Sequence, residues 1–147
     1  MNNKVVTGIK EFILGGKADF TIHRDAFNGK KPATFKYRVV ANDNNTCWFV
    51  YAELNESGDL EHNGKNLVYQ GYLKRDMSFN VGKKGVADYN KTAIDALLWV
   101  LDKGDKLPYM VHVFHHGKCS RCGRRLTDVE SLRCGLGPTC RKKSVFK

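Results

Sequence analysis

Residues 33–41 read Ala-Thr-Phe-Lys-Tyr-Arg-Val-Val-Ala, and they carry the clearest strand pattern of the chain. Apolar and aromatic side chains alternate with polar ones, which is the two-residue period of a strand with one buried face. The same alternation runs through residues 18–22, and an Asn-Gly pair stands between the two stretches at positions 28–29. Because Asn-Gly favours the tight turns of antiparallel hairpins, these segments predict the first hairpin of a sheet.

Segments on both sides extend this pattern into an α+β fold. Short apolar runs predict further strands, and two segments with helical spacing of apolar residues predict helices that cover the sheet. The predicted strands are 47–52, 67–73, 77–81 and 109–113, and the predicted helices are 5–14 and 90–102. The sequence therefore predicts an antiparallel β-sheet with two covering helices over residues 1–114. A cysteine-rich segment follows in residues 115–147, which we call the cysteine module.

Length and composition fit one ordinary domain and an intracellular setting. The chain has 147 residues, of which 41% are hydrophobic and 27% are charged, enough apolar material for a packed core. No apolar run approaches the ~20 residues that a membrane-spanning helix needs. The first residues lack the basic, apolar and small-residue order of a signal peptide. We expect a cytoplasmic protein with no membrane partner.

Four of the five cysteines lie within residues 119–140, and their spacing is typical of a metal site. The run Cys119-Ser-Arg-Cys122-Gly is a zinc knuckle, in which two intervening residues let both sulfurs turn towards one ion. Pro138 suits the first turn of a helix, which would place the thiolate of Cys140 near the free N–H groups of that turn. These residues predict a structural Zn²⁺ held by Cys119, Cys122 and Cys140 in a basic module of the treble-clef or zinc-ribbon kind, with iron as the competing metal.

Two residues are candidates for the fourth ligand. Cys134 would complete a site of four thiolates, the soft ligands that suit zinc. His115, four residues before Cys119, would instead give three thiolates and one imidazole. We favour Cys134 and keep His115 as the alternative ligand.

The cysteine module also holds most of the net charge of +10. Residues 117–147 contain nine lysines and arginines against Asp128 and Glu130, and a basic surface of this kind favours nucleic acid as a partner. The candidate nucleic-acid-binding residues are Arg121, Arg124, Arg125, Arg133, Arg141, Lys142 and Lys143. Aromatic residues of the predicted strands would add stacking platforms where they face outwards, although most are expected in the core. These aromatic residues are Phe35, Tyr37, Trp48, Phe49, Tyr51, Tyr69 and Tyr72.

The cysteine module resembles the C-terminal part of a family of uncharacterised phage and bacterial proteins. The shared pattern is Cys-x-x-Cys-Gly-Arg-x-Leu-Thr, followed by Gly-x-Gly-Pro-x-Cys, and it covers residues 119–140. The resemblance implies a zinc site and a phage or mobile-element setting rather than an activity. It also implies that a histidine near His115 is usual, whereas the position of Cys134 often holds another residue.

The motifs favour a binding protein over an enzyme. A catalytic zinc needs an open coordination position and a nearby acid or base, and Asp128 and Glu130 do not stand in a deaminase or metalloprotease pattern. We therefore expect no enzymatic activity. Two partners remain: nucleic acid, which the basic charge favours, and a host protein that a phage factor would bind and modulate.

Overall fold

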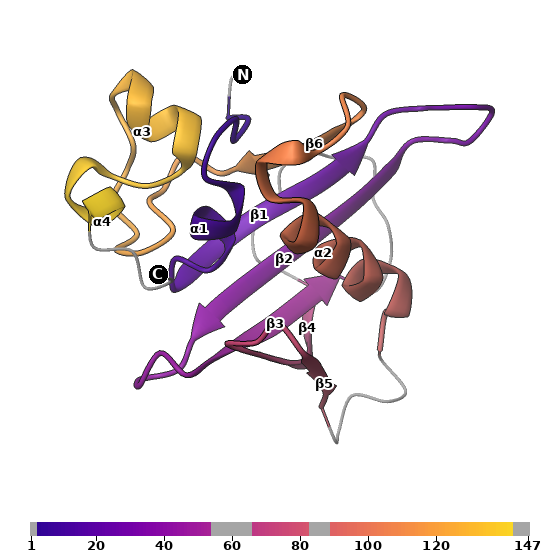
Figure 1. Ribbon diagram of the computed structural model, residues 1–147, viewed down its shortest axis with the longest axis horizontal. Coiled ribbons are helices and arrows are strands. Elements are labelled where there is room, and N and C mark those ends of the chain that lie inside the picture. Colours follow the sequence, from indigo (N-terminus) through magenta and orange to yellow (C-terminus); the bar gives the residue numbers. More distant parts are fainter. Residues whose placement is uncertain (1–2, 54–65, 83–88, 143–147) are drawn as a thin grey trace.

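The computed structural model describes residues 3–53, 66–82 and 89–142 (Figure 1). It confirms the predicted α+β class, with one six-stranded antiparallel sheet and short helices. The elements are α1 (Ile9–Ile13), β1 (Lys17–Arg24), β2 (Ala33–Ala41), β3 (Cys47–Glu53), β4 (Leu67–Lys74), β5 (Phe79–Val81), α2 (Lys91–Lys103), the 3₁₀ turn η1 (Gly104–Lys106), β6 (Val111–His115), α3 (Val129–Cys134) and α4 (Pro138–Lys142).

Strands β1 to β5 form a meander, and the last strand, β6, pairs with the free edge of β1. Its order is β5-β4-β3-β2-β1-β6, and all neighbours are antiparallel. The β1–β2 hairpin forms at the predicted Asn-Gly pair, where Asn28 and Gly29 both have positive φ, 51° and 75°. Strand β6 pairs with β1, and it ends where the cysteine module begins. The cysteine module therefore begins at the edge of the sheet that β6 forms.

The core lies between the sheet and the two helices α1 and α2, which lie on the same face (Figure 1). Side chains of β1 to β3 alternate between this face and the opposite one. Among the seven aromatic residues singled out above, Tyr37 and Trp48 are fully buried in the core, and Phe35 packs against its edge. The strand register puts the other four, Phe49, Tyr51, Tyr69 and Tyr72, on the opposite face, where they are half-buried.

The first helix is shorter than the predicted helix over residues 5–14. Gly8 has φ 70°, outside the helical region, and the backbone N–H of Val5 bonds to the carbonyl of Val113 at 2.8 Å. The segment before Gly8 is thus extended beside β6 instead of helical. The carboxylate of Asp105 accepts hydrogen bonds from the N–H groups of Gly8 at 3.0 Å and Ile9 at 2.9 Å. A side chain remote in sequence therefore caps α1.

The second helix begins and ends as its sequence predicts. Asn90 accepts a hydrogen bond from the N–H of Ala93 at 3.1 Å, and Gly104 follows the last residue with φ 57°. Ile94, Leu97 and Leu101 face the core. None of the helices in the described segments has the length and apolar character that crossing a membrane requires.

Replacing Asp105 by alanine removes the cap of α1, so we expect the free energy of unfolding to fall by about 1 kcal/mol. The measurement is urea denaturation of the wild type and the variant. Asp102→Ala, an exposed neighbour on α2, is the control and should change stability by less than about 0.5 kcal/mol. Equal effects of the two substitutions would contradict a capping role for Asp105.

Candidate metal centre

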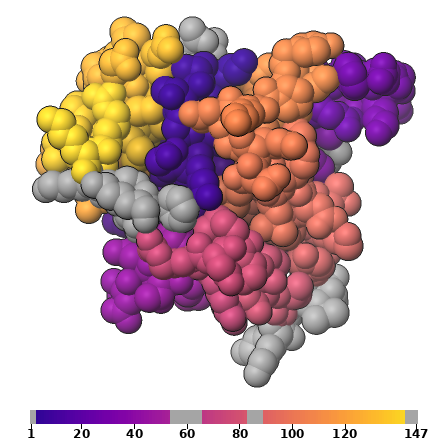
Figure 2. All heavy atoms as spheres, in the orientation of Figure 1, coloured from indigo at the N-terminus to yellow at the C-terminus, as the bar shows by residue number. Residues whose placement is uncertain are grey.

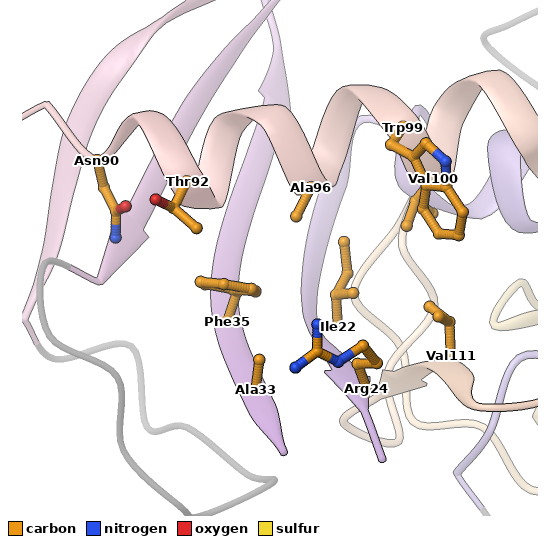
Figure 3. Close-up of a pocket in the computed structure, with 10 residues that line it drawn as sticks. All are labelled: Ile22, Arg24, Ala33, Phe35, Asn90, Thr92, Ala96, Trp99, Val100 and Val111. Atoms are coloured by element: carbon orange, nitrogen blue, oxygen red, sulfur yellow. The ribbon is translucent and has the colours of Figure 1, made fainter. Parts of the chain in front are cut away.

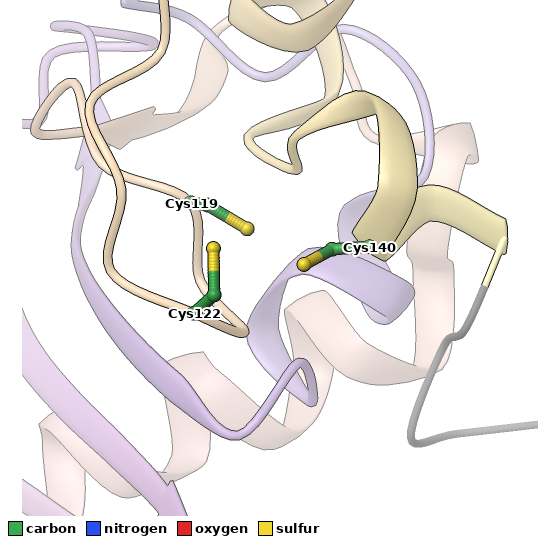
Figure 4. Close-up of side chains that lie close together, drawn as sticks. All are labelled: Cys119, Cys122 and Cys140. Atoms are coloured by element: carbon green, nitrogen blue, oxygen red, sulfur yellow. The ribbon is translucent and has the colours of Figure 1, made fainter.

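Three cysteines meet at the end of the molecule formed by the cysteine module (Figure 4). The sulfurs of Cys119, Cys122 and Cys140 all lie within 4.8 Å of one another. Sulfurs that bind one tetrahedral zinc at ~2.3 Å lie about 3.8 Å apart, so the spacing fits a shared metal ion. Cys119 and Cys140 are buried, and Cys122 is exposed. This cluster can hold a metal ion, and it contains three of the predicted ligands.

The first two ligands are held by a tight hairpin. The N–H of Cys119 bonds to the carbonyl of Arg124 at 2.8 Å, and Lys118 pairs with Arg125 as an antiparallel bridge. Gly123 closes the turn with φ 80°, a conformation that glycine adopts without strain. The backbone after Cys122 therefore takes the zinc-knuckle geometry that the sequence predicts.

The third ligand comes from the start of a short helix. Pro138 is the first residue of α4, and Cys140 lies in its first turn. Just before the helix, the N–H of Gly137 donates a hydrogen bond to the sulfur of Cys119 at 3.3 Å. This bond links the two halves of the cluster, because it joins the loop that supplies Cys140 to the knuckle.

The surroundings of the sulfurs favour thiolate at Cys119. Burial alone would raise the pKa of Cys119, but backbone N–H groups of Gly137, Cys122 and Arg121 outweigh it and lower that pKa. The pKa of Cys140 is raised, mainly by burial and further by the neighbouring sulfurs. Cys119 therefore ionises before Cys140. A divalent cation among the sulfurs would favour thiolate at both residues and remove their mutual repulsion.

Neither candidate for the fourth ligand joins the three sulfurs. Cys134 is buried beside the cluster, and its thiol contacts the carbonyl of Leu136 at 3.4 Å. His115 is also buried, and both ring nitrogens are engaged: Nδ1 accepts from the N–H of Gly117 at 2.9 Å, and Nε2 lies 2.8 Å from the carbonyl of Leu132. Since the first bond makes Nδ1 an acceptor, Nε2 carries the proton and donates. Burial lowers the pKa of His115, although the bond to Leu132 opposes it.

The predicted nucleic-acid-binding residues divide into two groups. Arg121 and Arg141 are half-buried, and their guanidinium groups point at sulfur: Arg121 lies 3.9 Å from Cys140 Sγ, and Arg141 lies 4.0 Å from Cys134 Sγ. The exposed ones are Arg124, Arg125, Arg133 and Lys142. Lys143 lies outside the described residues. The sequence shows that these residues are basic, but it does not show which of them turn inwards to the cysteines.

The module packs directly against the N-terminal segment, as the contact between the yellow and indigo atoms in Figure 2 shows. Val6 N–H bonds to the carbonyl of Arg133 at 2.8 Å, and Lys17 N–H bonds to that of Ser120 at 2.5 Å. The Phe12 ring lies so close to Gly135 that an added Cβ there would be 2.2 Å from a ring carbon. The boundary predicted at residue 115 is therefore crossed by backbone bonds and core packing.

Comparison with known proteins finds one match, to part of the chain. Residues 110–145 match a family of unknown function, DUF6011. The match begins just before β6 and runs through the cysteine cluster. No curated protein and no solved structure matches the chain. The phage setting that the resemblance implies stays a prediction.

Serine substitutions separate the three clustered cysteines from Cys134. We expect Cys119→Ser, Cys122→Ser and Cys140→Ser each to weaken or abolish binding of one Zn²⁺ per chain, because each removes a thiolate ligand. Cys134→Ser should retain the metal. The measurement is native mass spectrometry with metal analysis.

Nitrogen NMR of His115 during zinc addition supplies the matching test for the imidazole. We expect its Nε2–H tautomer to persist, since both ring nitrogens are already engaged. Loss of zinc in Cys134→Ser, or a zinc-dependent shift at a His115 nitrogen, would instead restore that residue as the fourth ligand.

Two glycine substitutions isolate the contact between the module and helix α1. Gly117 and Gly135 both have positive φ, 82° and 73°, but only Gly135 lacks space for a Cβ. We expect Gly117→Ala to cost about 1 kcal/mol through backbone strain alone. Gly135→Ala should cost about 1–3 kcal/mol more, because the methyl group collides with Phe12. Denaturant unfolding of the zinc-loaded proteins measures both, and equal costs would contradict the close packing.

Proposed function

We propose that this chain is a small zinc-binding protein that binds nucleic acid through the basic surface of its cysteine module. The observation that supports it most is the position of Arg124 and Arg125. Both are exposed on the hairpin that supplies Cys119 and Cys122, and both border a cleft of about 460 Å³ that includes the three clustered sulfurs. Two adjacent guanidinium groups at an open cleft are suited to the negative charges of a phosphate backbone.

Ion pairing within the described segments leaves these arginines available. The module contains one ion pair there, between Arg141 and Asp128 at 4.0 Å. Neither Arg124 nor Arg125 has a carboxylate within 4.0 Å among the described residues. A zinc ion with three thiolates has a net charge of −1, so the basic residues still outweigh the centre itself. The surface keeps its positive potential with the metal bound.

The proposed contacts are to phosphates, not to base edges. Arg124, Arg125 and Arg133 carry charge on an exposed surface, whereas Arg121 contacts Cys140 of the cluster and Arg141 contacts Cys134 beside it. Contacts to phosphate give affinity with little sequence preference. Zinc then has a structural role, which is to fix the hairpin that displays the arginines.

A binding role also fits the chemistry of Asp128, the carboxylate that lines the cleft. Its side chain caps α3 by accepting a hydrogen bond from the N–H of Ser131 at 3.1 Å. Hydrogen bonding from Ser131 lowers the pKa of Asp128, which makes it a poorer base. We accordingly propose a structural zinc site rather than a catalytic one.

Salt dependence tests the proposal. We expect affinity for unrelated DNA or RNA oligonucleotides to fall steeply with salt concentration. Replacing Arg124 and Arg125 by alanine should reduce the slope of log K against log salt by about 1.4 for single strands and about 1.8 for duplex DNA, because two phosphate contacts are lost. Fluorescence anisotropy at several salt concentrations measures the slope.

The matched control removes two other neighbouring exposed basic residues. Lys74 ends β4 and Arg75 follows it, and in the sheet β4 is separated from β1 and β6 by β3 and β2. Their double alanine variant should leave the slope unchanged. Binding that ignores both salt and the Arg124/Arg125 substitutions would overturn the nucleic-acid proposal. The basic surface would then favour the alternative partner, an acidic face of a host protein.

A further inference from the structure

A second cavity lies far from the cysteines, between α2 and the sheet. It has a volume of about 620 Å³, within the range of small-molecule sites. Its walls come from α2 on one side and from β1, β2 and β6 on the other (Figure 3). The lining residues are Ile22, Arg24, Ala33, Phe35, Asn90, Thr92, Ala96, Trp99, Val100 and Val111. The cavity is therefore framed by regular elements rather than by loops.

Most of this lining is apolar, and two of its side chains are flat. Phe35 packs at the edge of the core, and Trp99 stays 39% exposed although it belongs to the helix that covers the sheet. Ala33 and Ala96 are small and leave room between the helix and the strands. Such walls favour an apolar ligand, with aromatic rings well suited to stacking on Trp99 or Phe35.

One charged group points into this apolar space. In Figure 3 the guanidinium of Arg24 points towards Ile22, Ala33 and Phe35. Its Nη2 donates to the carbonyl of Lys31 at 2.6 Å, but its Nε is buried and has no hydrogen-bond partner. The other terminal nitrogen, Nη1, has no hydrogen-bond partner among the described residues, so the end of the guanidinium can donate to a carboxylate in the cavity.

The neighbouring acid does not neutralise Arg24. Asp25 follows it in the chain, but its carboxylate binds His112 at 2.8 Å and His23 at 3.3 Å. Within the described segments no carboxylate, that of Asp25 included, lies within 4.0 Å of a nitrogen of the Arg24 guanidinium. The positive charge of Arg24 is therefore not neutralised by a carboxylate of the described residues. A ligand with a carboxylate would neutralise it.

We propose that this cavity is a binding site for a small apolar carboxylate, with Arg24 holding the carboxylate and the surface between Phe35 and Trp99 holding the apolar body. Thr92, near the start of α2, offers a hydroxyl at the other end of the cavity for a second polar group. The site is separate from the cysteine module, and its occupation does not depend on nucleic-acid binding.

Paired acids and alcohols test the proposal by isothermal titration calorimetry. The probes are 2-naphthoate against 2-naphthalenemethanol for an aromatic body, and octanoate against octanol for an aliphatic one. At least one acid should bind, and its alcohol should bind about tenfold or more weakly, because the alcohol cannot make the charge-assisted hydrogen bond to the guanidinium. The acid that binds more tightly shows whether the cavity prefers an aromatic or an aliphatic body.

Two variants place the binding in this cavity. Arg24→Gln should reduce the affinity for the acid to that for the alcohol and leave the alcohol unchanged. Ala96→Leu should abolish binding of both, since leucine fills the cavity while favouring the helix. Arg75→Gln, an exposed arginine on another part of the sheet, should leave both affinities unchanged. Circular dichroism and thermal unfolding confirm that each variant is folded.

Tryptophan emission supplies an independent readout. Trp48 is fully buried and Trp99 is partly exposed in the cavity wall, so a ligand-dependent change should vanish in Trp99→Phe. The proposal is overturned if neither acid binds at concentrations up to about 1 mM. It is equally overturned if acid and alcohol bind alike, or if a folded Arg24→Gln protein keeps the preference for the acid.

Discussion

The close contact between the Phe12 ring and the backbone of Gly135 joins the cysteine module to the sheet. Phe12 is fully buried, and there is no room for a side chain at position 135. Gly15 and Ser120 meet in the same way nearby, where an added Cβ would lie 2.3 Å from the serine hydroxyl. Interiors packed this closely transmit strain rather than absorb it. The helix α1, strand β6 and the cysteine hairpin are therefore one packed unit.

This packing explains how the three-cysteine cluster, in a module without a large core of its own, is kept in place. The apolar cluster of the module is small and consists mostly of the cysteines with Leu126 and Leu136. His115 adds to it from β6, since its buried ring joins the hairpin at Gly117 to α3 at Leu132. A metal ion among the three sulfurs would fasten the hairpin to α4, and the Phe12 contact fastens both to the sheet.

This arrangement also sets the directions in which the arginine side chains point. Arg121 and Arg141 turn towards sulfurs, while Arg124 and Arg125 stay at the surface of the hairpin. Charge that faces the cysteines and charge that is exposed on the hairpin are thus supplied by separate residues. Arg24 belongs to neither group, because the end of β1 directs it under α2, into an apolar cavity.

Much of the fold is determined by local sequence. Alternation predicts the strands, Asn28-Gly29 predicts the hairpin, and Asn90 and Gly104 mark the ends of α2, because each of these signals acts over a few residues. The knuckle at Cys119 and Cys122 and the helix start at Pro138 are local in the same sense. They suffice to bring three sulfurs together once the chain closes between them.

Tertiary structure decided the features that depend on contacts between segments remote in sequence. The helix predicted over residues 5–14 is shortened because Val5 pairs with Val113 and Asp105 caps the backbone at Gly8. His115 and Cys134 are plausible ligands by spacing, but only the folded chain shows that carbonyls of Leu132 and Leu136 engage them. The cavity around Arg24 has no sequence signature either, since its walls come from four separate segments. The sequence by itself determined most of the strands, the α2 helix and the cysteines that could hold a metal, because these signals are local, whereas packing between remote segments decided which side chains meet.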